Sequence, residues 1–491
     1  MAGRALEALS FDNSYARLPE AFHAKLNPTP FSSSPYLISF NAAAAELIDL
    51  DPAEAARPEF AGVFGGSLLV PGMEPLAMLY AGHQFGVYVP QLGDGRAILL
   101  GEVRNARGEK WDLQLKGAGL TPFSRDGDGR AVLRSTIREY LCSEAMHGLG
   151  IPTTRALCIV GSDHQVYREQ VETGAIVVRM APSHVRFGSF EVFYYRQQHE
   201  QLKVLADYVI ARHYPHLTGA PDPYARFFDE VVERTAKLIA QWQAVGWAHG
   251  VLNTDNMSIL GITLDYGPFG FIDDYDPGFI CNHSDHNGRY AFSQQPYIGL
   301  WNLSCLAQAL LPLAGKDELK AALDRYTPVC EGRYMELMRA KVGLLDRQEE
   351  DAELIQDLLG LMHQHRVDYT IFFRALGDFR SAPGDPNDGL RDFFLDRDAF
   401  DRWARRYAER LRAAGSRDEE RRARMNRVNP KYVLRNYLAQ QAIEKAQQKE
   451  FSEIDRLLTL LRNPFDDQPG MEAYAAAPPN WGKHLSVSCS S

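Results

Sequence analysis

The order of two kinds of sequence pattern most strongly constrains the fold of this chain. Short apolar or alternating runs at 97–103, 111–116 and 175–180 are bounded by glycine and charged residues, which is typical of strands. A single helix is expected among them, at 134–149. From about residue 200 onward, apolar residues recur at helical spacing, as in 227–246, where Gly246 can end the helix. The sequence therefore predicts an α+β protein in which a small β-rich part precedes a larger helical part.

The length of 491 residues exceeds what one compact core usually holds, so several parts are expected. Further helices are expected at 299–313, 320–341, 348–379, 396–414 and 430–448. The predicted divisions are an N-terminal extension (1–75), a β-rich part (76–195), a helical part with the catalytic and metal motifs (196–345), a helical extension (346–465) and a tail (466–491). A nucleotide can bind in the cleft between the β-rich and helical parts.

Composition excludes several classes of protein. The net charge of −10 disfavours a general nucleic-acid binder, and the arginines of 405–427 alternate with acids, as on a solvated helix face. The first twenty residues lack the apolar core of a secretion signal, and no stretch approaches the roughly 18 apolar residues of a membrane helix. Six cysteines without a C-x-x-C pair disfavour a zinc site or a disulfide scaffold. We expect a cytoplasmic protein with no membrane and no nucleic-acid partner.

The segment HGVLNTDN, 249–256, resembles a protein-kinase catalytic loop, H-R-D-L-x-x-x-N, that has lost its aspartate. His249, Leu252 and Asn256 match the pattern, but Val251 stands where the aspartate should be. Valine can neither accept a proton nor bind a metal ion. Asp255 is the only acid within the loop, so it is the candidate general base. The alternative is an aspartate that only forms the turn.

Two groups of acids compete as metal ligands beside Asn256. DYG at 265–267 resembles the metal-binding DFG of kinases and offers Asp265. FIDDYDP at 271–277 resembles the metal site of small-molecule phosphotransferases and offers Asp273, Asp274 or Asp276. Mg²⁺ prefers hard oxygen ligands, which every one of these carboxylates supplies. The spacing alone does not separate the two assignments.

Several residues are candidates for holding phosphate groups. Gly93 and Gly95 lie in LGDGR between two predicted strands, where glycine lets backbone N–H groups approach phosphate, although a plain hairpin is the alternative. Arg96 follows that turn. Lys116 ends a strand whose apolar residues face the other side, and Glu139 of the next helix can orient it. The alternatives are an exposed lysine and a capping box that pairs Glu139 with Thr136.

Further along, GDGR recurs at 127–130 and offers Asp128 and Gly129 in a second glycine-rich loop, with a flexible connector as the alternative. Arg179 ends a strand and Arg186 lies in the following loop. Two arginines can clamp a phosphate in bidentate fashion, although surface ion pairs are the alternative. Each signal is weak alone, but the order of glycine loop, lysine, helix glutamate, H-x-x-L-x-x-x-N and D-Y-G is far more specific.

In this order of motifs the chain resembles the selenoprotein O (SelO/YdiU) family, pseudokinases that act as protein adenylyltransferases. The resemblance covers nearly the whole chain, and its long matches are 80–102, 112–141, 183–191, 249–277 and 429–446. It implies a protein-kinase-like fold of two lobes with extra helices. It also implies that ATP lies flipped, with the γ-phosphate buried, so that AMP passes to a Ser, Thr or Tyr hydroxyl of a protein and pyrophosphate leaves.

The resemblance implies a role for each matching residue. Lys116, oriented by Glu139, would contact phosphate, and Asp255 would accept the proton. Asn256 and Asp265 would hold Mg²⁺ or Mn²⁺, which favours Asp265 over the acids of 271–277. The remaining nucleotide contacts would come from Gly93, Gly95, Arg96, Asp128, Gly129, Arg179 and Arg186.

Three other functions stay open at this point: a phosphotransferase with Asp255 as a displaced base, a nucleotide-binding pseudokinase scaffold, and a uridylyltransferase that uses UTP with Mn²⁺. Some family members carry selenocysteine near the C-terminus, where this chain has Cys489. Cys281 lies 16 residues beyond Asp265, where a kinase has its activation segment. We hypothesise that Cys281 and Cys489 form a disulfide that regulates activity with redox state.

Overall fold

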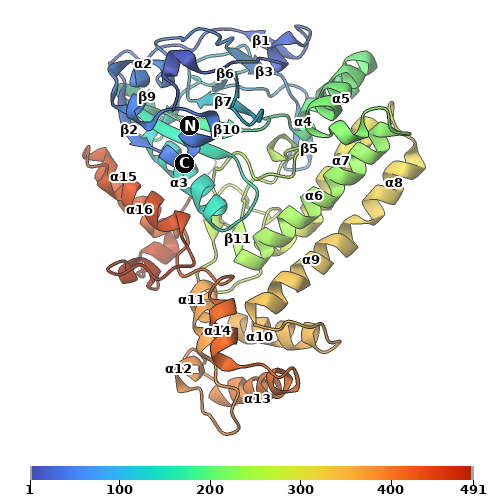
Figure 1. Cartoon of the computed structure of the whole chain (residues 1–491), viewed down its shortest axis with the longest axis vertical. Coiled ribbons are helices and arrows are strands. Elements are labelled where there is room, and N and C mark those ends of the chain that lie inside the picture. Colours follow the sequence, from blue (N-terminus) through green and yellow to red (C-terminus); the bar gives the residue numbers. More distant parts are fainter. Residues whose placement is uncertain (1–2, 488–491) are drawn as a thin grey trace.

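The computed structural model describes residues 3–487, and its strand-rich part forms one antiparallel sheet (Figure 1). Across the sheet the order is β1 (His23–Lys25), β3 (Leu76–Met78), β6 (Ala97–Arg104), β7 (Lys110–Lys116), β10 (Val171–Ala181), β9 (Arg155–Tyr167) and β2 (Tyr36–Phe40), and the short β8 (Ala131–Val132) pairs with β10. The predicted strands at 97–103, 111–116 and 175–180 are confirmed as β6, β7 and β10. Two strands from the first 75 residues, β1 and β2, belong to this same sheet.

The alternation predicted for β7 is confirmed. Trp111, Leu113 and Leu115 pack into the core on one face of the sheet, where α1 (Ala42–Ala45) and α2 (Pro58–Phe64) supply further apolar residues. Gln114 and Lys116 point to the opposite face. Antiparallel pairing sets Gln114 opposite Arg179 of β10, so the polar side chains of two neighbouring strands converge on one face of the sheet.

Helix α3 (Leu133–Gly148) packs against β9 and β10, and it corrects one prediction. The capping box of Thr136 and Glu139 is absent: the helix begins after Val132, and the Thr136 hydroxyl donates to the Leu133 carbonyl within the first turn. Glu139 is thereby left for a tertiary partner. On its outer side α3 is covered by α15 (Asn436–Gln447) and α16 (Ser452–Arg462), so the C-terminal helices return to the sheet (Figure 1).

The helical part begins with α4 (Phe187–Tyr195), α5 (His199–His213) and α6 (Pro223–Val245), and α6 confirms the helix predicted at 227–246. Gly246 ends it with φ of 74°, a left-handed conformation that glycine adopts readily. The helix predicted at 299–313 is α7 (Gln295–Leu310). The one predicted at 320–341 is two helices, α8 (Lys316–Asp324) and α9 (Tyr326–Lys341), because the chain turns at Arg325 and buries Tyr326 against α7.

A second apolar core joins the helices that lie farthest from the sheet in Figure 1. These are α10 (Asp351–His365), α11 (Tyr369–Ala375), α12 (Asp388–Arg391), α13 (Arg397–Ala413) and α14 (Asp418–Met425). The single helix predicted at 348–379 is divided into α10 and α11, because Arg366 adopts a left-handed conformation and Asp368 caps the second helix. Among the described residues, no helix has the length and apolar character needed to cross a membrane.

Two small hairpin-like pairs flank the segment 249–256. Strands β11 (Trp247–Ala248) and β12 (Gly270–Phe271) pair with each other. The chain between them, which contains the predicted catalytic loop and the DYG segment, therefore begins and ends at this pair of strands. Strands β4 (Gly82–Gln84) and β5 (Val87–Val89) form a separate pair. The hydroxyl of Thr254 accepts a hydrogen bond of 2.7 Å from the His83 backbone N–H, which fixes the β4–β5 hairpin on the loop.

Candidate active site

A polar cavity of about 440 Å³ opens between the polar face of the sheet and the loops of the helical part. Its lining contains the candidate base Asp255 and every residue that the family resemblance assigns to nucleotide or metal: Gly93, Gly95, Arg96, Lys116, Asp128, Gly129, Arg179, Arg186, Asn256 and Asp265. Val251 also lines it. These positions span more than 170 residues of sequence, so their convergence is a property of the tertiary fold. Their roles in binding and catalysis remain proposals.

Lys116 and Glu139 form a buried ion pair between β7 and α3. Glu139 is 2% exposed, and its other oxygen lies 3.3 Å from Arg179 Nη1. Burial lowers the pKa of Lys116, and the nearby Glu139 carboxylate acts in the opposite direction. The glutamate thus favours the charged form of the lysine and fixes where its ammonium group points, which is the arrangement expected of a phosphate-binding lysine.

Asp265 lies between two buried arginines. One carboxylate oxygen accepts from Arg179 and the other from Arg186, and the Arg186 guanidinium stacks 4.5 Å from the ring centre of Tyr80. Burial acts to raise the pKa of Asp265, but Arg179, Arg186 and Lys116 together hold it well below its usual value. Its φ of 58° is uncommon for a residue other than glycine, as often found at functional sites.

Asp255 differs from Asp265 in its surroundings. Its Oδ2 accepts a 3.2 Å hydrogen bond from Gln84 Nε2, whereas its buried Oδ1 has no partner among the described residues. Burial raises the pKa of Asp255 to about 7, although Arg186 acts to lower it. A carboxylate that lines a cavity and has a pKa near neutrality is suited to accept a proton.

The rest of the loop is held by its own polar groups. His249 is buried, and its Nε2 lies 3.0 Å from the Leu264 carbonyl while its Nδ1 lies 3.3 Å from the Val251 backbone nitrogen. The imidazole therefore links the loop to the segment that carries Asp265. Asn256 Nδ2 donates to the Val251 carbonyl at 2.8 Å, which leaves its amide oxygen for another ligand. Val251 gives the cavity an apolar wall where a kinase has its base.

The two glycine-rich loops pack on each other. The hairpin alternative for GDG is wrong, because β5 pairs with β4 while β6 pairs with β3 and β7. Gly93 has φ of 81°, and a Cβ there would lie 2.6 Å from the Phe123 ring. A Cβ on Gly129 would lie 2.1 Å from the Gly119 carbonyl oxygen. Packing of Gly93 on Phe123 and of Gly129 on Gly119 therefore requires glycine at these two positions, whether or not phosphate binds there.

Asp128 and Arg96 have different surroundings within the cavity. The Asp128 carboxylate pairs with Arg168 at 2.7 Å, and this hydrogen bond is the main reason that its pKa is lowered. Arg96 forms no ion pair with any other described residue, and its side chain is exposed at the cavity. Arg125 is likewise exposed at the cavity, so these two arginines are the ones most accessible to an incoming anion.

The rival acids of 271–277 lie outside the cavity. Asp273 pairs with Arg435, Asp274 pairs with Lys483, and Asp276 accepts from the Gly278 backbone N–H at 2.8 Å. The structure therefore brings Asp265, and none of these three, next to Asn256 in the cavity. Spacing could not decide this, because both segments follow the loop at short range.

The residues present fit a divalent cation. The amide oxygen of Asn256 and the carboxylate of Asp265 are hard oxygen donors in one cavity, as Mg²⁺ or Mn²⁺ requires. Both Asp265 oxygens accept from arginines here. An incoming polyphosphate would offer Arg179 and Arg186 alternative partners and free the carboxylate for the ion.

The proposed thiol pair can be described only in part. Cys281 is 7% exposed, and its Sγ lies 3.6 Å from the Ala248 carbonyl oxygen. The His283 backbone N–H donates to the Val487 carbonyl at 2.8 Å, so the tail runs beside the segment that carries Cys281. Cys489 lies outside the described residues.

Sequence reasoning missed three polar residues that hold Asp255 and its loop. Gln84 bonds to Asp255 directly, while Glu191 of α4 accepts from the Thr254 hydroxyl and lies 2.6 Å from His83 Nδ1. Histidine and glutamine together in GHQFG, just before the glycine loop, were the only available signal. Nothing in the sequence marks Glu191, because its partners lie more than 60 residues away.

The charge of the cavity is opposite to that of the whole chain. Seven basic residues and four acids line it, whereas the chain carries a net charge of −10. The basic residues are Arg96, Lys116, Arg125, Arg130, Arg168, Arg179 and Arg186. A concentration of cations at a neutral or acidic protein's main cavity favours a polyanionic ligand such as a nucleoside triphosphate.

Comparison with known proteins agrees with this geometry. The family model described as "Protein adenylyltransferase SelO" matches residues 5–462. Proteins named "Protein nucleotidyltransferase YdiU" are 65% identical in Myxococcus xanthus, 62% in Thioalkalivibrio sulfidiphilus and 60% in Thiobacillus denitrificans, each over 99% of both chains. The chain therefore belongs to the SelO family, a family of nucleotidyltransferase enzymes.

Proposed function

We propose that this protein transfers AMP from ATP to a Ser, Thr or Tyr hydroxyl of another protein and releases pyrophosphate. The observation that carries the proposal is that the catalytic loop has its acid at a different position from the base of a kinase. Val251 leaves the kinase base position apolar, while Asp255, with a pKa of about 7, lines the same cavity and keeps one carboxylate oxygen without a partner among the described residues. The candidate base therefore lies further along the loop than the base of a kinase. We infer that the phosphorus atom that reacts also differs from the one that reacts in a kinase.

In the proposed reaction the acceptor hydroxyl oxygen forms a bond to the α-phosphorus. The bond from that phosphorus to the oxygen bridging to the β-phosphate breaks, and pyrophosphate leaves with the electron pair. Asp255 takes the hydroxyl proton on its carboxylate. Gln84 holds this carboxylate directly, and the His83 backbone N–H donates to the hydroxyl of the neighbouring Thr254, so the base is oriented before the substrate arrives.

The buried cations supply the charge that the leaving group needs. Lys116, Arg179 and Arg186 are 8%, 3% and 2% exposed, so they lie at the closed end of the cavity. We place the β- and γ-phosphates there, which is the flipped orientation, and the α-phosphate toward Asp255. Lys116 and Arg179 are already held by Glu139, so they are in place to stabilise the departing pyrophosphate. The order of groups also supports a kinase-like two-lobed arrangement around the cavity.

Asn256 and Asp265 would hold the divalent ion, Mg²⁺ or Mn²⁺. When bound, such an ion neutralises phosphate charge and orients the polyphosphate chain. We propose the reducing cytoplasm as the place of reaction. In oxidising conditions a Cys281–Cys489 disulfide would tie the tail to the segment after β12, which lies next to the catalytic loop.

The test is a labelling assay with the purified full-length protein. ATP labelled at the α-phosphate or the γ-phosphate is incubated separately with Mg²⁺ or Mn²⁺ and a reducing agent, beside α-labelled UTP and an Asp265→Ala control. Label should enter protein only from the α-phosphate of ATP and should be lost in the control. Label from the γ-phosphate would identify a kinase. A strong preference for UTP with Mn²⁺ would identify a uridylyltransferase, and nucleotide binding without labelling would identify a scaffold.

A further inference from the structure

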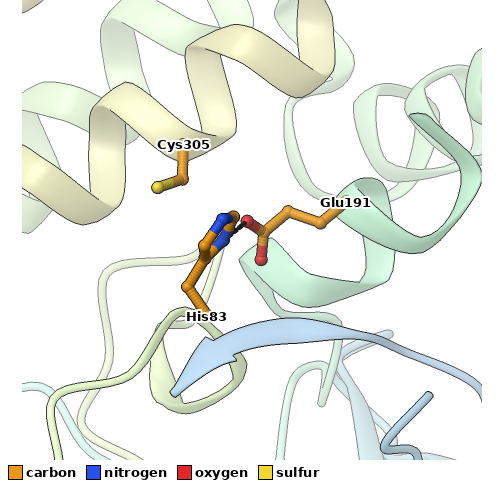
Figure 2. Close-up of side chains that lie close together, drawn as sticks. All are labelled: His83, Glu191 and Cys305. Atoms are coloured by element: carbon orange, nitrogen blue, oxygen red, sulfur yellow. Dashed lines mark hydrogen bonds and ion pairs between the residues drawn. The ribbon is translucent and has the colours of Figure 1, made fainter. Parts of the chain in front are cut away.

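A second group of metal-binding side chains lies beside the catalytic loop and outside the nucleotide cavity. His83 of β4, Glu191 of α4 and Cys305 of α7 converge from three elements, as Figure 2 shows. One ligand atom from each of the three lies within 4.8 Å of the other two. None of the three lines the cavity that holds Asp255 and Asp265.

This group is enclosed. The Glu191 side chain is 0% exposed and that of His83 is 11% exposed, while Cys305 is 9% exposed. The rings of Tyr88, Tyr195 and Trp301 surround the imidazole of His83, with centroids 5.3, 5.8 and 5.3 Å away. A carboxylate, an imidazole and a thiol are seldom gathered in so apolar a place, because each loses hydration there.

The donor set selects a class of ion. Imidazole nitrogen, thiolate sulfur and carboxylate oxygen together suit Zn²⁺ and similar ions, whereas Mg²⁺ prefers oxygen donors alone. The chain has no C-x-x-C pair, but this site needs none, since its ligands come from positions 83, 191 and 305. Burial raises the pKa of the Cys305 thiol to about 12, so an ion must displace its proton to solvent.

A hydrogen bond that would orient Glu191 as a metal ligand is already present. The Thr254 hydroxyl donates to Glu191 Oε2, which leaves Glu191 Oε1 directed at His83. Protein carboxylates that bind metals are commonly oriented in this way. The slightly exposed edge of His83 gives an ion a route of entry.

We propose that His83, Glu191 and Cys305 bind one Zn²⁺-class ion, with a water molecule in the fourth position. Binding forms bonds from the metal to a ring nitrogen of His83, to a Glu191 oxygen and to the Cys305 sulfur. It releases the thiol proton and breaks the His83–Glu191 hydrogen bond. The proposal does not depend on which nucleotide the enzyme uses.

An ion at this site would act on the catalytic loop. His83 and Glu191 both hold Thr254, the neighbour of Asp255. A Cβ on Gly82 would lie 2.9 Å from the Asp255 Cβ, so the β4 strand packs directly on the candidate base. Joining β4 to α7 through a metal would therefore fix the β4–β5 hairpin and the loop together. A bound ion should change the rate of transfer without competing with ATP.

The experiment titrates the reduced, chelator-treated full-length protein with Co²⁺ in excess Mg²⁺, which occupies oxygen-ligand sites. A near-ultraviolet absorption of a cobalt–thiolate bond should appear with one equivalent of Co²⁺ and disappear on addition of Zn²⁺. Cys305→Ser should abolish it, His83→Gln should weaken binding at least 100-fold, and Thr254→Val should weaken it about 10–100-fold. Circular dichroism and the thermal midpoint establish that each variant is folded.

Matched controls separate this site from other thiols. Cys330→Ser removes another buried cysteine, and a Cys281→Ser, Cys489→Ser double variant removes the proposed redox pair. Both should keep the full absorption. The proposal is overturned if no thiolate absorption forms, or if it persists in folded Cys305→Ser. In either case His83 and Glu191 serve only as a hydrogen-bonded support for Thr254.

Discussion

Asp265 and Asp273 lie eight residues apart, and each pairs with buried arginine, yet they belong to opposite kinds of site. Asp265 is 18% exposed and Asp273 is 22% exposed as side chains. Burial raises the pKa of Asp273 despite Arg435, whereas the cations around Asp265 overcome burial and lower its pKa. Local sequence and solvent exposure therefore do not distinguish the two.

The ratio of cations to acids does distinguish them. Arg435 pairs with two carboxylates, Asp273 and Asp368, so that cluster is complete without a ligand. Asp265 and Glu139 together face three cations, Lys116, Arg179 and Arg186, so the cavity keeps an excess of positive charge. A buried cluster with more cations than acids needs an anion from outside, and a cluster with enough acids supports the fold.

The largest expected effect is on catalysis, from Asp265→Asn. Losing this carboxylate removes one metal ligand and frees two arginines, so kcat should fall about 10³-fold while the protein stays folded. The measurement is single-turnover transfer from α-labelled ATP, with circular dichroism for folding. Activity within tenfold of wild type in a folded Asp265→Asn protein would show that this carboxylate does not hold the metal.

Asp273→Asn should have the opposite effect, a loss of stability with little change in transfer activity. It leaves Arg435 with only Asp368, and breaking a buried ion pair lowers the free energy of unfolding by about 2–4 kcal/mol. Transfer activity at 20 °C should stay within about threefold of wild type. Thermal unfolding and the same labelling assay measure both quantities. A large loss of activity at unchanged stability would instead indicate that the acids of 271–277 bind the metal.

Glu139→Gln tests whether the ammonium group of Lys116 must be oriented by a carboxylate for the enzyme to use ATP efficiently. Without this carboxylate Lys116 loses its partner, and kcat/KM for ATP should fall about 10–30-fold, which corresponds to about 2 kcal/mol of transition-state stabilisation. Glu144→Gln is the matched control on the same helix, since Glu144 pairs with Arg155 away from the cavity. It should lower the thermal midpoint and leave kcat/KM unchanged in the folded protein. Equal losses of kcat/KM in both variants would contradict the assignment.

Lys341 extends the comparison to a buried cation that forms no ion pair with an acid among the described residues. It is 5% exposed, contacts the rings of Tyr369 and Phe373, and lies at a small apolar cavity. Burial lowers its pKa to about 7. Between pH 7 and about 10.5 the unfolded chain binds this proton and the folded protein does not, so stability rises with pH across that window.

A pKa of about 10.5 in the unfolded chain and about 7 in the folded protein corresponds to about 4–5 kcal/mol of lost stability at low pH. Lys341→Met should therefore stabilise the protein by up to about 4 kcal/mol at pH 6.5, and the gain should vanish above about pH 10.5. Urea unfolding at several pH values measures it. Lys237→Met, which removes an exposed lysine paired with Glu233, should show no such pH-dependent gain. A gain that stayed constant with pH would mean that packing, and not the buried charge, is responsible.

Much of the fold follows from sequence periodicity, because alternation and helical spacing reflect contacts with immediate neighbours. The strands β6, β7 and β10, the helix α6 with its glycine end, and the polar face of Lys116 were all predicted in this way. The capping box at Thr136 was wrong, because Glu139 finds its partner 23 residues away on β7. The divided helices were also missed, since Arg325 and Arg366 are not helix-breaking residues.

The sequence by itself determined which chemical groups the active site contains, because the types and the order of residues in short motifs are local properties. Only the tertiary structure decided which acid faces the cavity, that Gln84 and Glu191 support the candidate base, and that His83, Glu191 and Cys305 meet. Those contacts join elements distant in sequence, so they depend on how the sheet and helices pack. Burial and neighbouring charges then set the pKa values, and these exist only in the folded chain.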